Sequence, residues 1–477
     1  MSPAIVPEYE PMAVQCSPSA IELITAYAAR QWREPACDAQ FGAAARVTYR
    51  ALLDTVAVSI AGQCEEATRI ARAYVAPLRG TSDALDWGTG ERLPAESAAF
   101  VNGIAAHVLD YDDVMTPMRA HVSATLVPAL AALAPRTDAC GREFAGAFIA
   151  GFEVMSRFAR VMALDHYTRG WHSTSALGIL GTATACGVLL RLNEAQMRDT
   201  LGLAVAQASG TRENFGAMAK SFQSAHCAAS AVRAALLAQA GFTAAASAID
   251  GRYGYLALYA CGEDMGPALA GLGEAPSEIL RVGLDLKKYP CCYGVHRALD
   301  AVLDIRRGHG LVPQDIERIE ILTSAGGLQA LRLDKPRTGL QAKFSMAYVV
   351  AAALIDGHIG LRSFDDAAVL RADVDHLMQR VRVIEAPGPI LPRWSEVVIH
   401  TRDGRSFRRR VTVAHGDAGD PLTDSELTEK AIDCFAWAGW PGDATGFAGK
   451  ALDMADQKVA ALIEHCCALA ATVSSRS

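Results

Sequence analysis

The sequence lacks the short motifs by which many cofactor sites and nucleophiles are recognised. It contains no GxGxxG after a strand pattern, no GxxxxGK[ST] phosphate loop and no GxSxG turn. Nicotinamide, ATP and serine-hydrolase chemistry are therefore disfavoured. CxxC and HExxH are also absent, and the 12 cysteines are scattered apart from Cys291-Cys292 and Cys466-Cys467. Because zinc and iron–sulfur sites need ligands in recognisable groups, we expect no metal and no other cofactor.

Blocks of like charge and long apolar runs are also missing. Lys and Arg number 45 against 52 Asp and Glu, and Arg408-Arg409-Arg410 is a short basic triplet, so we expect no nucleic-acid partner. The longest charge-free stretch, near 170–190, contains Trp, His, Ser and Thr, which favours a buried helix over a membrane span. The N-terminus has no basic segment followed by an apolar one. We therefore expect reduced thiols and a cytoplasmic protein, or an organelle-matrix protein in a eukaryote.

Composition and periodicity predict a mostly α protein. Apolar residues make up 51% of the chain, and abundant Ala and Gly favour closely packed helices. Residues 1–17 are predicted to form a loosely attached arm, and Ser19 with Glu22 forms a capping box that opens the first helix. Apolar residues then recur at helical spacing in 45–62, 97–109, 123–133, 143–161, 173–190, 194–208 and 225–241.

The pattern changes after about residue 284. Residues 316–323 and 381–385 alternate like strands, and 396–401 and 406–413 flank the turn dipeptide Asp403-Gly404. Helices are predicted near 345–356 and 364–370, and helical patterns return with a capping box at Thr423 and Glu426 and an amphipathic run at 452–469. We therefore expect a large all-α domain, residues 18–283 and 417–477, with a smaller α+β lid domain, residues 284–416, inserted into it. The cleft between two such domains is a common place for a ligand site.

Three polar clusters interrupt the helical part. His107-Val-Leu-Asp110-Tyr-Asp112-Asp113 ends an apolar helix, and His121 follows shortly after. Gly170-Trp-His172 opens an Ala/Gly-rich helix, whose N-terminus favours anions. A glycine-containing loop precedes helix 225–241 and delivers Lys220. Taken singly, each cluster also fits an ordinary structural role as a helix cap, a core histidine or a surface lysine.

Two further clusters belong to the predicted α+β domain. Lys287-Lys-Tyr-Pro-Cys291-Cys292 is followed by His296 at the domain junction. A cysteine near a histidine suggests a nucleophile, whereas adjacent cysteines do not readily chelate one tetrahedral metal. Lys343-Phe-Ser-Met-Ala-Tyr348 begins a helix, where Tyr348 is by default a core aromatic residue with a satisfied hydroxyl.

Together, the order of these clusters along the chain and their residue sequences resemble the MmgE/PrpD family from about residue 19 to about residue 470. This family includes 2-methylcitrate dehydratases, cis-aconitate decarboxylases and an iminodisuccinate epimerase. The resemblance implies a helical domain with an α+β lid, a homodimer and no cofactor. By position it implies an active site containing Asp110, His121, His172, Lys220, Lys287 and Tyr348, lined also by Cys292 and His296. Departures from the family pattern include Val114 and Met115 after the Asp-Asp pair, and Cys292 where the animal decarboxylases carry a histidine.

The substrate implied by the resemblance is a small di- or tricarboxylate. We expect Lys220 and Lys287 to bind its carboxylates, and His121 or His172 to act as general acid or base. Asp110 would then orient an imidazole, and Tyr348 would donate a hydrogen bond. Dehydration of a 2-methylcitrate-like hydroxy acid is the favoured reaction. Decarboxylation of cis-aconitate to itaconate, epimerisation of an iminodicarboxylate and non-catalytic polycarboxylate binding are the alternatives.

Overall fold

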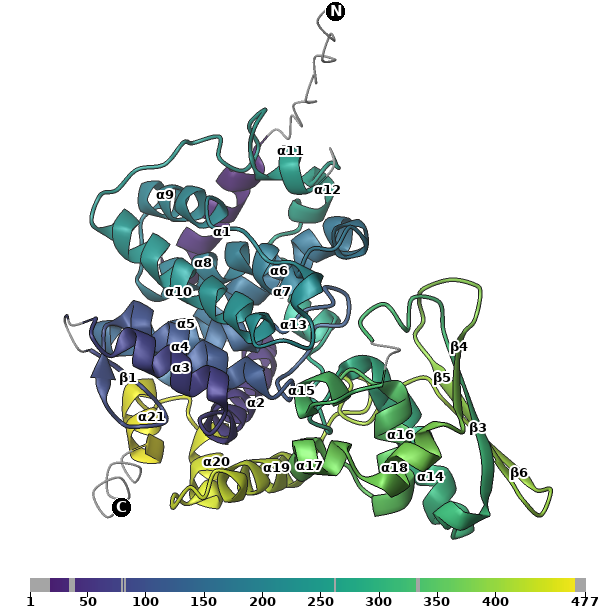
Figure 1. Cartoon of the computed structure of the whole chain (residues 1–477). Coiled ribbons are helices and arrows are strands. Elements are labelled where there is room, and N and C mark those ends of the chain that lie inside the picture. The colour runs from purple at the N-terminus through teal and green to yellow at the C-terminus, as the bar shows by residue number, and fades with distance from the viewer. Residues whose placement is uncertain are drawn as a thin grey trace, which may run out of the picture.

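A computed structural model describes residues 18–33, 39–78, 80, 83–260, 263–331 and 335–467. Figure 1 shows a large helical lobe beside a smaller lobe built of helices and one main sheet. The predicted arm, residues 1–17, lies outside the described residues. The mostly α fold class is confirmed by the order of elements along the chain.

Two separate hydrophobic cores define the lobes. The core of the helical lobe runs from Ala20 to Leu286 and continues from Leu422 to Cys467. The core of the α+β lobe lies between Tyr289 and Val411. The exact domain limits at residues 284 and 416 stay predictions, but the chain enters and leaves the α+β lobe near these positions.

Helices account for most of the helical lobe. Before the chain enters the α+β lobe they are α1 (Ala20–Arg33), α2 (Ala39–Gly62), α3 (Glu66–Val75), α4 (Ala95–Val108), α5 (Ser123–Thr137), α6 (Gly141–Thr168), α7 (Ser173–Ala176), α8 (Gly178–Leu189), α9 (Glu194–Val205), η1 (Arg212–Asn214), α10 (Ala219–Gln239), α11 (Tyr255–Tyr259), α12 (Gly266–Leu269) and α13 (Glu278–Arg281). A small hairpin of β1 (Ala84–Leu85) and β2 (Arg92–Leu93) precedes α4. Because α10 begins at Ala219, Lys220 lies in its first turn, and the prediction that a loop carries this lysine is wrong.

Small residues let α4 and α10 approach closely. A Cβ atom added to Gly103 would lie 2.9 Å from the Cα of Ala225, which is closer than ordinary packing permits. This contact joins the middle of α4 to the first half of α10. It therefore brings His107, near the end of α4, next to Lys220, near the start of α10.

The α+β lobe is built on a four-stranded sheet in the order β4-β3-β5-β6. Its elements are η2 (Tyr293–Val295), α14 (His296–His309), η3 (Pro313–Asp315), β3 (Ile316–Thr323), α15 (Gly339–Ala342), α16 (Met346–Asp356), η4 (Leu361–Phe364), α17 (Asp366–Val369), α18 (Ala372–Met378), β4 (Val381–Glu385), β5 (Ser395–Thr401) and β6 (Ser406–Val411). Strand β3 pairs parallel with β4 and antiparallel with β5, and β5 forms the predicted hairpin with β6. Ile319, Val397 and Ile399 alternate into the core, where α14 and α16 cover the sheet (Figure 1).

The chain returns to the helical lobe through α19 (Asp424–Trp437), α20 (Ala444–Leu452) and α21 (Val459–Cys467). The capping box of Thr423 and Glu426 is confirmed. The prediction of one amphipathic run over 452–469 is wrong, because α20 ends at Leu452 and α21 begins only at Val459; residues 468 and 469 lie outside the described residues. Of the helices in the described ranges, none is long and apolar enough to cross a membrane.

Candidate active site

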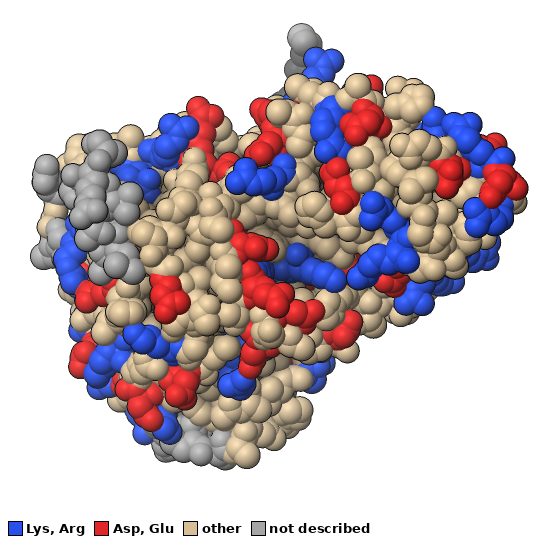
Figure 2. Space-filling model, turned by 90° about the horizontal axis from the view of Figure 1, so that it is seen from below, with Lys and Arg blue, Asp and Glu red and all other residues tan. Residues whose placement is uncertain are grey.

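A cavity of about 130 Å³ between the lobes brings together residues that are far apart in the sequence. Figure 2 shows the molecule hollowed between its two lobes, with basic side chains inside the hollow. The charged residues that line the cavity are one acid, Asp110, and four bases, Arg119, Lys220, Arg297 and Arg393. The cavity is therefore suited to an anion with more than one negative charge.

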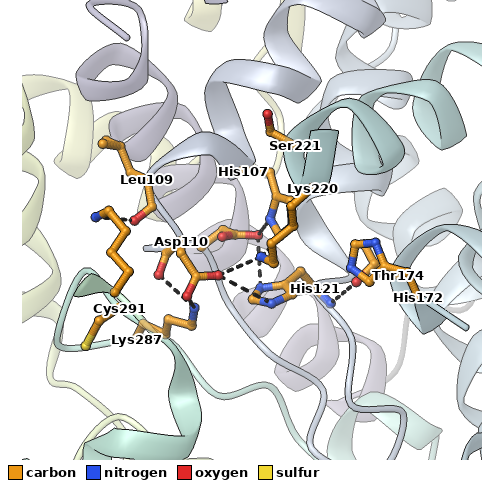
Figure 3. Close-up of polar contacts among 12 residues, drawn as sticks. His107, Leu109, Asp110, His121, His172, Thr174, Lys220, Ser221, Lys287 and Cys291 are labelled. Carbon is orange, nitrogen blue, oxygen red and sulfur yellow. Dashed lines mark hydrogen bonds and ion pairs between the residues drawn. The ribbon is translucent and has the colours of Figure 1, made fainter. Parts of the chain in front are cut away.

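Asp110 is held between two buried lysines directly after α4. Its backbone has a φ of 51°, which is uncommon for a residue other than glycine. Lys220 Nζ lies 2.7 Å from one carboxylate oxygen and Lys287 Nζ lies 3.2 Å from the other (Figure 3). Burial alone would raise the pKa of Asp110, but Lys220, Lys287 and His121 outweigh burial and hold this pKa far below its usual range. Asp110 is therefore a fixed negative charge that positions two cations.

His107 connects this ion-pair group to a second carboxylate. Its Nδ1 lies 2.7 Å from Asp112 Oδ2, and its Nε2 lies 2.8 Å from Lys220 Nζ. Because an ammonium group only donates, Nε2 accepts and Nδ1 carries the proton that is donated to Asp112. Burial lowers the pKa of His107, so the ring is neutral at pH 7. His107 is not among the predicted site residues, although its position three residues before Asp110, at the end of α4, is a signal present in the sequence.

His121 is the more exposed of the two cavity histidines. Its Nδ1 lies 3.2 Å from Asp112 Oδ2, its Nε2 lies 3.8 Å from Asp110 Oδ1, and 13% of its side chain is exposed. Burial is the largest influence on its pKa, which it lowers to about 3 despite the nearby Asp112 carboxylate. His121 is therefore neutral at pH 7 in the unliganded cavity.

His172 presents a free ring nitrogen to the same cavity. It is the N-cap residue of α7, as the sequence predicts, and its Nδ1 lies 2.8 Å from Gln223 Oε1. The Gln223 amide donates to the Thr211 carbonyl, which leaves its oxygen to accept from His172 Nδ1. His172 Nε2 has no hydrogen-bond partner among the described residues, and burial, with Lys220 next, holds the pKa of the ring well below its usual value. His172 therefore presents an unprotonated, unpaired ring nitrogen to the cavity.

The predicted site residues outside this group occupy different settings. Cys292 lines the cavity, and burial raises the pKa of its thiol to about 11, so it is not a ready nucleophile. Lys287 is fully buried behind Asp110 and does not line the cavity. His296 is also fully buried, with Nε2 directed at the Cys291 carbonyl. The Tyr348 hydroxyl donates to the Ser363 carbonyl inside the core of the α+β lobe, so the structure does not bring it to the cavity.

Two buried lysines that the sequence analysis did not select support the site from behind. Lys343 Nζ donates to the carbonyls of Leu109 and Pro290, and burial lowers its pKa to about 8. Lys430 pairs with Asp54 at 2.6 Å and donates to the Lys287 carbonyl. Both lysines fix the chain immediately beside Asp110 and Lys287.

The nearest arrangement to a metal site in the described ranges consists of His107, Asp112 and His121. A hydrogen bond accounts for the short distance from His107 to Asp112, and the Lys220 ammonium occupies the remaining nitrogen of His107. A cation at this nitrogen opposes a second cation, so the residues do not fit a metal well. The metal-free site stays a prediction.

Fold and site together define a two-lobed, largely helical protein with a cationic, histidine-containing pocket between the lobes. The chain belongs to the MmgE/PrpD family: residues 34–268 match the MmgE/PrpD N-terminal domain and residues 289–441 match the MmgE/PrpD C-terminal domain. Cis-aconitate decarboxylase of Homo sapiens is 29% identical over 396 residues, covering 80% of this chain and 81% of that protein. The mouse (Mus musculus) cis-aconitate decarboxylase is 28% identical, with 81% of each chain covered. The Aspergillus terreus enzyme of the same name is 26% identical, with 72% of each covered.

Proposed function

We propose that this protein is a lyase that decarboxylates cis-aconitate to itaconate. The observation that carries the proposal is that Lys220 and the neutral rings of His121 and His172 face one small cationic cavity. Dehydration is the reaction expected from the sequence. The names of the relatives instead support decarboxylation. Both reactions use a polycarboxylate, so the choice between them rests on the relatives and is decided by assay.

The cavity offers what the decarboxylation requires. The bond between the CH2 carbon of cis-aconitate and its carboxylate breaks, and CO2 leaves. The electron pair shifts through the double bond, so negative charge develops on the CH carbon and on the carboxylate attached to it. Lys220 uses two N–H groups on Asp110 and His107, which leaves a third for this carboxylate. A fixed cation at such a point lowers the barrier by about 3–4 kcal/mol in comparable sites.

Itaconate forms when the CH carbon receives a proton. His121 and His172 are neutral without ligand, so one of them must first gain a proton. A bound trianion favours this step because negative charge nearby raises the pKa of an imidazole. Asp112 beside His121 and Gln223 beside His172 then hold the rings in fixed orientations. Which histidine delivers the proton is the remaining choice within the proposal.

A substrate panel tests the proposal. Cis-aconitate should yield itaconate and one equivalent of CO2, detected by proton NMR and by CO2 release, and Lys220→Ala and His172→Ala should abolish most of this turnover. An alkene product from 2-methylcitrate without CO2 would establish dehydration instead. Proton exchange and epimerisation of iminodisuccinate would establish the third reaction. Tight binding of a polycarboxylate without any turnover would favour the non-catalytic alternative.

We also propose that two copies of the chain form a homodimer. Exposed apolar side chains gather along α3 and the start of α10, where Ile70 is 55% exposed, Tyr74 66% and Phe222 49%. A groove runs between these helices. Contiguous exposed apolar surface of this kind is typical of protein interfaces. The cytoplasmic location stays a prediction.

A further inference from the structure

Two of the arginines that line the cavity have no acidic partner among the residues that the structure describes. Arg119 and Arg393 both belong to the cavity wall, as does Arg297. Arg297 lies 3.3 Å from Asp417. Within the described part of the chain, neither Arg119 nor Arg393 has a carboxylate at ion-pair distance; Arg119 donates to Gln329 Oε1 and Arg393 to the Ala325 carbonyl. Each guanidinium group has five N–H donors, so most of them remain for a ligand.

The backbone at Arg119 holds this side chain in place. Arg119 has a φ of 54°, an uncommon conformation for a residue with a side chain. It closes a turn in which the Met115 amide is paired with the Ala120 carbonyl and the Arg119 amide with the Thr116 carbonyl. The guanidinium carbon lies 5.1 Å from the centre of the Tyr167 ring, and its Nη1 lies 2.7 Å from Gln329 of the α+β lobe. Such strain persists where surrounding contacts determine the conformation, and it is concentrated at functional sites.

The positive charges in this wall act on one another. Arg212 lies over the same Tyr167 ring at 4.0 Å and donates to the carbonyls of Tyr167 and Gln329. Burial lowers the pKa of Arg393 to about 10, with Arg119 and Arg297 as the next causes. Like charges gathered in a partly buried wall repel each other, and a bound anion relieves that repulsion. The wall therefore has the character of an anion site.

Arg393 comes from the other lobe than Lys220, and Arg119 is linked to that lobe through its hydrogen bond to Gln329. Lys220 is already paired with Asp110 and comes from α10 of the helical lobe, whereas Arg393 comes from the segment before β5 of the α+β lobe. One cavity thus has cations on both of its sides. A short ligand such as a small dicarboxylate can stay on the Lys220 side, whereas a tricarboxylate spans the cavity and uses both sides.

We propose that Arg119 and Arg393 form a second carboxylate subsite, which binds a substrate carboxylate other than the one at Lys220 and makes the cavity select tricarboxylates over short dicarboxylates. This inference rests on the proposed function in one respect, which is that the ligand is a polycarboxylate. Guanidinium groups suit this task because their planar N–H pairs match the two oxygens of a carboxylate.

Binding of two non-reacting acids tests the subsite without any turnover. Tricarballylate carries three carboxylates and succinate carries two, and isothermal titration calorimetry gives a Kd for each. We expect Arg119→Gln and Arg393→Gln to weaken tricarballylate binding about tenfold to hundredfold, the range for losing one charge-assisted hydrogen bond. Succinate, which the Lys220 side can hold alone, should lose much less. Arg119→Lys, which keeps the charge without the planar donor pair, should give an intermediate loss for tricarballylate.

Arg408→Gln is the matched control, since Arg408 lies on β6 with 70% of its side chain exposed. It should change neither Kd. Equal weakening of both acids by Arg119→Gln and Arg393→Gln would overturn the subsite, because a general loss of positive potential would explain it, and unchanged tricarballylate binding would also overturn it. Circular dichroism checks folding; if one variant is misfolded, the other decides by the same criteria. Failure of cis-aconitate turnover with these binding differences intact would remove the proposed function and leave the subsite standing.

Discussion

Replacing Asp110 by asparagine removes a charge that two buried ammonium groups share. Lys220 Nζ and Lys287 Nζ lie 2.7 and 3.2 Å from its carboxylate oxygens. Removing one member of a buried pair costs about 3–5 kcal/mol, because the remaining charge stays buried without its partner. Lys287 would keep its hydrogen bond to the Asp110 carbonyl at 2.7 Å. We therefore expect Asp110→Asn to lower the free energy of unfolding by about 3–5 kcal/mol.

The same substitution should also lower turnover, because Asp110 holds Lys220 and Lys287 in place. Burial lowers the pKa of Lys287, and Asp110 is the largest influence that raises it. Without Asp110, Lys287 loses the charge that raises its pKa most, and Lys220 loses the carboxylate that holds its ammonium group in place. The developing negative charge of the substrate would then lose its electrostatic stabilisation, and we expect kcat to fall about 10²–10³-fold.

Glu153→Gln provides the matched control. Glu153 is also buried and its Oε1 lies 2.9 Å from Arg157 Nη2, but neither residue lines the cavity. Urea unfolding followed by circular dichroism gives stability, and itaconate production from cis-aconitate gives kcat. Both variants should be destabilised, and only Asp110→Asn should lose most of its kcat. Wild-type stability in Asp110→Asn, or an equal loss of kcat in the two variants, would refute the role assigned to this carboxylate.

Four further predictions concern catalysis, ligand protonation and assembly. Lys220→Met should lower kcat about 10²–10³-fold in steady-state assays; an unchanged kcat would remove Lys220 from the mechanism. Gln223→Leu removes the acceptor that orients His172 and should lower kcat about tenfold or more with little change in KM, whereas Gln223→Glu should restore activity with a pH profile shifted upwards, and a profile that does not move would contradict this role. Because the pKa of His121 is about 3 without ligand and a bound polycarboxylate raises it, binding should take up protons and tighten as pH falls; calorimetry at pH 6 in buffers of different ionisation enthalpy measures this uptake, which His121→Asn should reduce. Ile70→Glu, at a position 55% exposed on α3, should convert the proposed homodimer to monomer in sedimentation experiments, and an unchanged mass would place the interface elsewhere.

Local sequence determines the secondary structure closely in several places. The alternation in 316–323 and 381–385 predicts β3 and β4 at their observed limits, because side chains on a strand with one buried face must alternate. The capping pairs Ser19–Glu22 and Thr423–Glu426 are also predicted correctly, since their partners are only three residues apart. The prediction of one run over 452–469 is wrong because apolar spacing continues across residues 453–458, where the structure has a turn between α20 and α21.

The order of motifs also determines the family, and with it the residues Asp110, His121, His172, Lys220 and Cys292 that the structure gathers at one cavity. Their roles depend on contacts across long separations. Lys220 reaches Asp110 across 110 residues, and the packing of Gly103 on Ala225 makes this approach close. Packing within the α+β lobe places the Tyr348 hydroxyl against the Ser363 carbonyl, away from the cavity.

Only the tertiary structure decided which cations face the ligand. Lys287, Lys343 and Lys430 are lysines like Lys220 in the sequence, yet their ammonium groups pair with buried carbonyls and carboxylates. Arg119 and Arg393 line the cavity, and among the described residues neither has a carboxylate at ion-pair distance. Local propensity carries no information on this difference, because the charge that a side chain presents depends on burial and on partners brought from both lobes. The sequence by itself therefore determined the fold class, the family and most of the residues gathered at the cavity. The packing of the two lobes decided the electrostatics of that cavity.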